Sequence, residues 1–80
     1  MCILYHERIK QQARKLIKGG GIIGLAIFRN SDGVIEEIVT NEQQASLWIM
    51  NNEPKDEAEY SVTTVDLISI LDKEGCYEIK

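Results

Sequence analysis

Four glycines, at Gly19, Gly20, Gly21 and Gly24, are the first feature of the sequence that suggests chemistry. Loops that bind phosphate follow a strand and lead into the N-terminus of a helix, where free N–H groups point at the anion. Here the glycines follow a helical pattern and precede a strand-like segment, and no Gly-Lys-Ser/Thr ending is present. This order predicts a helix stop and a close packing position at Gly24, not a nucleotide site.

Cys2, His6 and Cys76 are the residues nearest in type to a zinc site or a thiol nucleophile. Structural zinc takes four ligands, and a Cys-His nucleophile needs an orienting group and an oxyanion site, which the sequence does not supply. We therefore expect no metal, no cofactor and no catalytic residue. Two cysteines are too few for a disulfide-rich secreted scaffold, so reduced thiols are expected. A bridge between them requires that the two terminal segments be neighbours.

Glu36 and Glu37 are adjacent carboxylates in a strand-like segment. Successive strand residues point to opposite faces, so the pair cannot act together as a general acid and base. One of the two must point toward an apolar side. A bulge, an edge position or a salt bridge to the basic helix would each accommodate it.

The elements that position these residues follow from the apolar periodicity. We predict an amphipathic helix over Tyr5–Lys18, a β-hairpin formed by Ile22–Arg29 and Val34–Val39, a short helix that starts at a Thr40–Gln43 capping box, and a strand over Tyr60–Val65. Leu67–Leu71 fits a helix or a strand, and we favour a second hairpin with Cys76–Ile79. The expected fold is α+β, in the order α-β-β-α-β-β, as one compact domain over residues 1–80. Trp48 shares a helical stripe with Ala45 and Ile49, which predicts a core position, with an interface anchor as the alternative.

The charges are divided between a basic head and an acidic body. Residues 1–30 carry six cations against Glu7 alone, and residues 31–80 carry twelve carboxylates against three lysines. The two parts either neutralise each other within the fold or across a dimer, or they dock oppositely charged partners. The overall acidity, with a pI near 4.9, argues against nucleic acid as the first choice of partner.

The apolar runs are far shorter than a membrane span, and the N-terminus lacks the pattern of a secretory signal. We therefore expect a cytoplasmic protein with no membrane association. An 80-residue domain offers little concave volume, which disfavours an enzyme unless two subunits form a cleft.

The sequence is most consistent with a small non-enzymatic protein-interaction domain, a regulator or inhibitor of a macromolecular partner and a candidate homodimer. Short acidic chains of this kind are typical of phages and other mobile elements. The alternative is a nucleic-acid-associated protein that binds through the basic N-terminal helix. The candidate partner-binding residues, basic and then acidic, are Arg8, Lys10, Arg14, Lys15, Lys18, Glu57, Glu59, Asp66 and Asp72.

Overall fold

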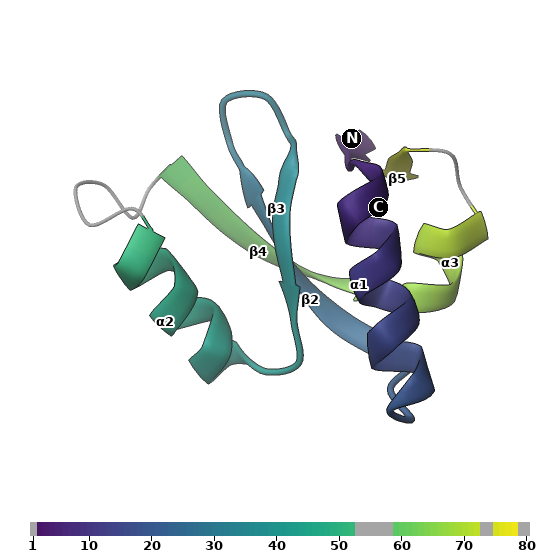
Figure 1. Ribbon diagram of the computed structural model, residues 1–80. Coiled ribbons are helices and arrows are strands. Elements are labelled where there is room, and N and C mark those ends of the chain that lie inside the picture. The colour runs from purple at the N-terminus through teal and green to yellow at the C-terminus, as the bar shows by residue number, and fades with distance from the viewer. Residues whose placement is uncertain (1, 53–58, 73–74, 79–80) are drawn as a thin grey trace.

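The computed structural model describes residues 2–52, 59–72 and 75–78, and it has an α+β fold (Figure 1). Along the chain the elements are β1 (Cys2–Leu4), α1 (Glu7–Lys18), β2 (Ile23–Arg29), β3 (Ile35–Val39), α2 (Glu42–Asn52), β4 (Tyr60–Asp66), α3 (Leu67–Asp72) and β5 (Cys76–Glu78). The predicted helices and strands between residues 5 and 66 are therefore present. Among the described residues, no helix combines the length and the apolar character that crossing a bilayer requires.

A three-stranded antiparallel sheet in the order β3-β2-β4 forms the middle of the molecule. Helices α1 and α3 lie on one side of it and α2 lies on the other (Figure 1). The main core fills the space between the sheet, α1 and α3, with buried side chains from Ile3, Tyr5, Ile9, Ala13, Ala26, Phe28, Ile35, Ile38, Val65, Leu67 and Ile70. Gly24 sits in this core as predicted, because an added Cβ would lie 3.0 Å from Ile38 Cγ2 and 3.1 Å from Leu67 Cδ2.

The two ends of the described chain pair with each other, an arrangement that was not predicted from the sequence. Strands β1 and β5 form an antiparallel ladder in which Leu4 is opposite Cys76. The ladder brings the Cα atoms of Cys2 and Cys76 to 5.9 Å, and the two residues form a disulfide. The expectation of reduced thiols is therefore wrong for this structure. The terminal segments are neighbours, which is the condition that a bridge between the two cysteines requires.

Residues Leu67–Asp72 form helix α3, so the favoured second hairpin is wrong. The helix is specified by its two buried positions, Leu67 and Ile70, which are three residues apart and face the core together. Its start is capped by Asp66, whose Oδ1 accepts a hydrogen bond from the Ile68 N–H at 3.0 Å. Strand β5 then pairs with β1 instead of β4.

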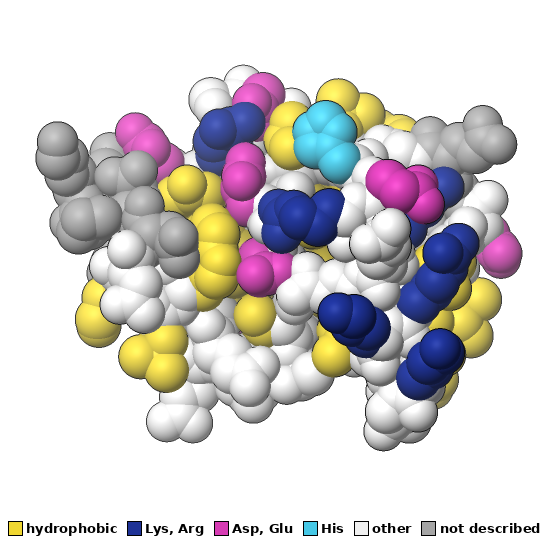
Figure 2. All heavy atoms as spheres, in the orientation of Figure 1, with side chains coloured by type: hydrophobic (Ala, Val, Ile, Leu, Met, Phe, Trp, Pro, Cys, Tyr) yellow, Lys and Arg dark blue, Asp and Glu magenta, His cyan; other side chains and the backbone are white. Residues whose placement is uncertain are grey.

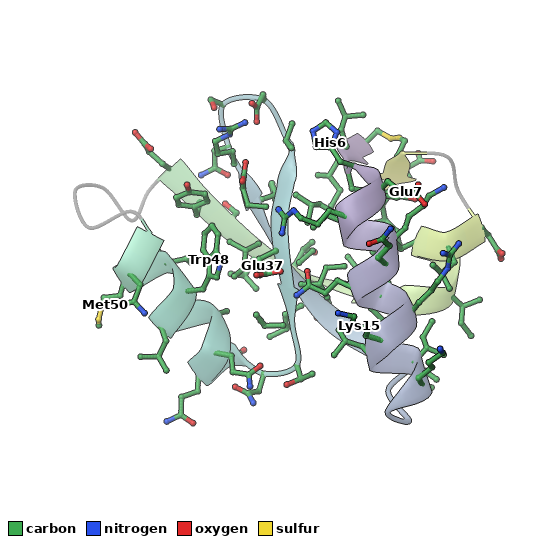
Figure 3. All side chains as sticks on the ribbon, viewed as in Figure 1. His6, Glu7, Lys15, Glu37, Trp48 and Met50 are labelled. Carbon is green, nitrogen blue, oxygen red and sulfur yellow. A yellow bond between two sulfur atoms is a disulfide. The ribbon has the colours of Figure 1, made fainter. Side chains whose placement is uncertain are left out.

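Helix α2 begins with a cap that lies one residue later than predicted. Asn41 Oδ1 accepts the Gln44 N–H at 2.9 Å, and Gln44 Oε1 accepts the Thr40 N–H at 3.2 Å. The Asn41–Gln44 bond is the first half of a capping box, but the Gln44 side chain reaches back to the N–H of Thr40, one residue before the N-cap. Trp48 lies between α2 and the sheet (Figure 3), but it is half-buried and lies outside the main core, with its ring 5.4 Å from that of Tyr60 in a T-shaped contact.

Tyr5 connects the N-terminal segment to α3 through a buried hydrogen bond. Its hydroxyl donates to the Ile70 carbonyl at 2.8 Å, one of the carbonyls that a helix C-terminus leaves without an intrahelical partner. Burial raises the pKa of Tyr5 above its ordinary value of 10.0, and a hydrogen bond with the Cys76 backbone partly offsets this. The folded state therefore favours the neutral phenol.

Replacing Tyr5 with phenylalanine is expected to lower the free energy of unfolding by about 1–3 kcal/mol, because the buried Ile70 carbonyl loses its partner. The raised pKa contributes stability that is complete below about pH 10 and is lost as the pH rises through the folded-state pKa. Tyr5→Phe should remove that alkaline loss. Urea unfolding at neutral and alkaline pH tests both effects, with Tyr77→Phe as the control because its hydroxyl accepts an exposed 3.2 Å bond.

Candidate functional site

The solvent side of α1 is the charged surface that the fold assembles. The basic face consists of Arg8, Lys10, Arg14, Lys15 and Lys18, all predicted from the sequence as partner-binding residues. Ile9 and Ala13 anchor the helix in the core, which turns the cations outward. Figure 2 shows Lys and Arg side chains gathered on the side of the molecule that carries α1.

The glycines after α1 end the helix as predicted. Gly21 N–H bonds the Leu16 carbonyl at 3.0 Å and Gly20 N–H bonds the Ile17 carbonyl at 2.9 Å. Gly20 has a φ of 98°, the left-handed conformation expected at this position of a Schellman cap. Lys15 and Lys18 lie in the last turn, where the helix dipole favours positive charge.

Arg8 is the residue of the basic face that the protein itself engages. Its Nη2 donates to the Glu36 carbonyl at 2.7 Å, and its Nη1 lies 4.0 Å from Glu37 Oε1. Within the described part of the chain, Lys10, Arg14, Lys15 and Lys18 form no ion pair. Among the described residues, Arg8 and Arg29 are thus the cations of the basic head that pair with the acidic body, and the other four cations form no ion pair.

A hollow of about 240 Å³ lies between α1 and β3 beside these cations. It is lined by Arg8, Gln11, Gln12, Lys15 and Glu37. The four α1 residues are spaced at i, i+3, i+4 and i+7, which places them on one side of the helix. Gln12 Oε1 is buried without a hydrogen-bond partner among the described residues, and an unpaired buried oxygen is costly. The hollow therefore offers cations, amides and one carboxylate to a bound group.

Glu36 and Glu37 are accommodated by all three devices considered from the sequence. The β2–β3 register shifts between Ile27 and Phe28, so that Glu37 pairs with Ile27, Ile35 pairs with Phe28, and Glu36 is the extra residue of a bulge. Strand β3 is an edge strand. Glu37 Oε1 lies 4.0 Å from Nη1 of Arg8 in the basic helix, and Glu36 Oε1 lies 3.4 Å from Nη2 of Arg29 in β2, so these carboxylates have structural roles.

Arg29 and Asp32 stabilise the hairpin turn. Two hydrogen bonds join the Arg29 guanidinium to the Asp32 carboxylate, at 3.2 and 2.7 Å. These bonds are the main cause of the lowered pKa of Asp32. This contribution to stability is present above the ordinary Asp pKa and is lost as the pH falls through the lowered one.

The acidic candidates do not form one patch. Glu59 and Asp66 lie just before and at the end of β4, about 23 Å apart at the usual strand rise. Asp66 caps α3, as described above, and Asp72 is exposed at the end of that helix. Glu57 lies outside the described residues. The acidic surface predicted from composition is therefore dispersed, whereas the basic one is gathered.

Other candidates for chemistry are placed apart. His6 is exposed at the N-cap of α1, and it makes no side-chain cap bond. The described residues hold no group of three or more His, Cys, Asp or Glu side chains that could bind a metal ion. The two sulfur atoms of the zinc set considered from the sequence, those of Cys2 and Cys76, are used in the disulfide.

A second surface was not predicted from the sequence. Side chains of α2, β2 and β4 line a hollow of about 300 Å³ on the α2 side of the sheet, formed by Leu25, Glu42, Ala45, Ser46, Ile49, Val62 and Thr64. Met50 points away from the sheet (Figure 3), and Leu47, Met50 and Val62 are 54%, 56% and 40% exposed. The available signal was the low amphipathicity of the second helix, whose apolar residues are not confined to one stripe.

Comparisons of the chain with protein-family models, with curated proteins and with solved structures find no match.

Proposed function

We propose that this chain is a small non-enzymatic binding protein that acts as a regulator or inhibitor by docking an acidic protein partner on the basic face of α1. The observation that carries the proposal is that Lys10, Arg14, Lys15 and Lys18 share the solvent side of one helix and form no ion pair within the described residues. Desolvating unpaired cations against carboxylates gives charge-assisted hydrogen bonds and speeds association.

The mixed lining of the hollow beside α1 favours a protein over a nucleic acid. Glu37 contributes a carboxylate and Gln11 and Gln12 contribute amides, which match a surface that carries donors and acceptors of both kinds. A phosphate backbone presents acceptors of one sign, and it would also be repelled by a chain whose net charge is −4. The protein partner is therefore the first proposal.

The test compares two variants with the same change in net charge. Lys15→Gln/Lys18→Gln removes two cations from the basic face, and Ser31→Asp/Gln43→Glu adds two carboxylates at exposed positions elsewhere. Tagged proteins capture partners from nuclease-treated lysate of the native source, and quantitative mass spectrometry compares them. We expect a protein retained by the wild type and the control to be lost from the basic-face variant. Equal retention by all three contradicts the proposal.

Nucleic-acid binding through α1 is the second candidate, favoured by the same unpaired cations. It predicts an affinity for duplex DNA or RNA that falls with salt, with a slope of log K against log salt of about −0.9 per phosphate neutralised. Lys15→Glu would abolish that binding. Absence of binding at about 50 mM salt, where phosphate contacts are strong, eliminates this candidate.

The cytoplasmic location stays a prediction, and the Cys2–Cys76 disulfide bears on it. Disulfides persist in oxidising compartments and are rare in the cytosol, where thiols are kept reduced. Alkylation of native cells at lysis distinguishes the two states by mass. Labelling of both cysteines supports the cytoplasmic location, and an unlabelled protein indicates an oxidising compartment.

A further inference from the structure

The two edge strands of the three-stranded sheet, β3 and β4, differ in their contacts with the rest of the molecule. At the β3 edge, the Arg8 guanidinium bonds the Glu36 carbonyl and Leu4 forms a bridge with Val34. The N-terminal segment and α1 thereby contact the start of this edge. At the β4 edge no other strand of the described chain is paired. An open edge presents unpaired N–H and C=O groups and is a template for another strand.

The ladder with β2 identifies which β4 groups point outward. The Leu67 N–H bonds the Ile22 carbonyl at 3.0 Å, and the Asn30 N–H bonds the Glu59 carbonyl at 2.8 Å. Hydrogen-bonded positions alternate in an antiparallel pair, so odd-numbered residues from 59 to 67 face β2. The backbone groups of Val62 and Thr64 therefore point away from the sheet, and they have no partner among the described residues.

Between Tyr60 and Val65, β4 lacks the usual features that protect an edge, and its charged residue, Asp66, lies at its C-terminal end. From Tyr60 to Val65 it has no charge and no proline, and its pairing with β2 runs without a bulge. The side chains of Val62 and Thr64 also line the hollow against α2, so the open edge and this hollow are continuous. A strand added here would gain backbone hydrogen bonds and side-chain contacts together.

We propose that two copies of this chain associate through β4, antiparallel and about a two-fold axis. The arrangement is self-complementary when Val62 is opposite Thr64 of the second copy, because the outward groups of both residues are then satisfied in both copies. A shift that pairs Asp66 with Val62 would leave the Val62 carbonyl without a donor, because the Asp66 N–H already bonds the Tyr77 hydroxyl, whereas in the proposed register Val62 and Thr64 satisfy each other. In the proposed register Asp66 is opposite Tyr60 and no carboxylates face each other.

The dimer would contain one six-stranded sheet with a β3 strand at each end. Strands are spaced by about 4.8 Å, so the two β3 strands would lie about 24 Å apart, with the two basic faces beyond them. If the proposed function holds, the dimer docks a partner at two points, which raises avidity without new contacts. The association itself does not depend on that function.

Sedimentation equilibrium over a concentration series tests the association. The interface is one strand wide, so we expect the wild type to double in mass in the micromolar range typical of small interfaces. Thr64→Lys places a charge on the open edge and should remain monomeric, whereas Ser31→Lys, with the same charge gain on the hairpin turn, should behave as the wild type. A wild type that stays monomeric at all concentrations, or a Thr64→Lys variant that dimerises equally, overturns the proposal.

A cross-linking experiment tests the register. Thr63 would face Thr63 of the second copy as a non-hydrogen-bonded pair with Cα atoms about 4.5 Å apart, a separation that a disulfide can bridge. Thr63→Cys should give a covalent dimer on mild oxidation, and Ser61→Cys, which would face Val65, should not. Equal cross-linking of both variants contradicts the register. Lys15→Gln/Lys18→Gln should dimerise normally, so loss of dimerisation and loss of partner capture are separate results.

Discussion

Replacing Cys2 with serine is expected to lower the free energy of unfolding by about 4 kcal/mol. The disulfide joins residues 74 positions apart, and closing so long a loop removes much of the conformational entropy of the unfolded chain. A loss of this size is large beside a total of about 4–12 kcal/mol for a domain of this length. Chemical denaturation of the wild type and of Cys2→Ser under non-reducing conditions measures the difference.

The matched controls break the same disulfide in other ways. Cys76→Ser and the double variant Cys2→Ser/Cys76→Ser should lose as much stability as Cys2→Ser and no more, because either single change already breaks the link. Reductant should destabilise the wild type by a similar amount and leave Cys2→Ser unchanged. A wild type whose stability is insensitive to reductant would show that the bond contributes nothing.

Replacing Leu67 with alanine is expected to cost about 3–4 kcal/mol, the middle of the range for truncating a fully buried leucine. Leu67 has no exposed surface and packs at Gly24, where α3 meets the sheet. The neighbouring Ile68 is 50% exposed, so Ile68→Ala should change stability by less than about 1 kcal/mol. Urea unfolding of the two variants provides the comparison.

A double-mutant cycle with Gly24 identifies the contact responsible. Gly24→Ala adds a methyl group that would lie 3.1 Å from Leu67 Cδ2, so it should destabilise the wild type. In the Leu67→Ala background part of that crowding is relieved, and the added methyl group fills some of the vacated space. Gly24→Ala should therefore cost less there. Equal costs in both backgrounds would show that Leu67 and Gly24 are not coupled.

Local patterns were sufficient to predict the elements whose signals are contained in one segment. The glycines after Lys18, the turn residues before Val34 and the β-branched run after Tyr60 each define an element from its own residues. The short N-terminal strand and helix α3 depend instead on distant partners. Leu67, in α3, packs against Gly24 of β2. Cys2 lies in a strand because that strand pairs with the segment that contains Cys76.

The sequence predicted the arrangement of the basic candidate residues but not that of the acidic ones. The cations of α1 share one helix, so helical periodicity alone places them on its solvent side. The acidic candidates come from different elements, and their separation depends on the extended length of β4, which composition does not report. The open edge of β4 was missed because strand order in a sheet is a property of the whole fold.

The pairing of the terminal segments also determines how the protein responds to force. Tension applied between residues 2 and 76 would pass through the covalent bond between the two sulfur atoms, and the residues between them would carry almost none of it. An unfolding motor that pulls on one end would have to pull two segments of the chain through its pore at the same time, until the disulfide is reduced. Mechanical resistance is thus coupled to the redox state of the surroundings, and the sheet, the basic face and the open edge lie inside the protected loop.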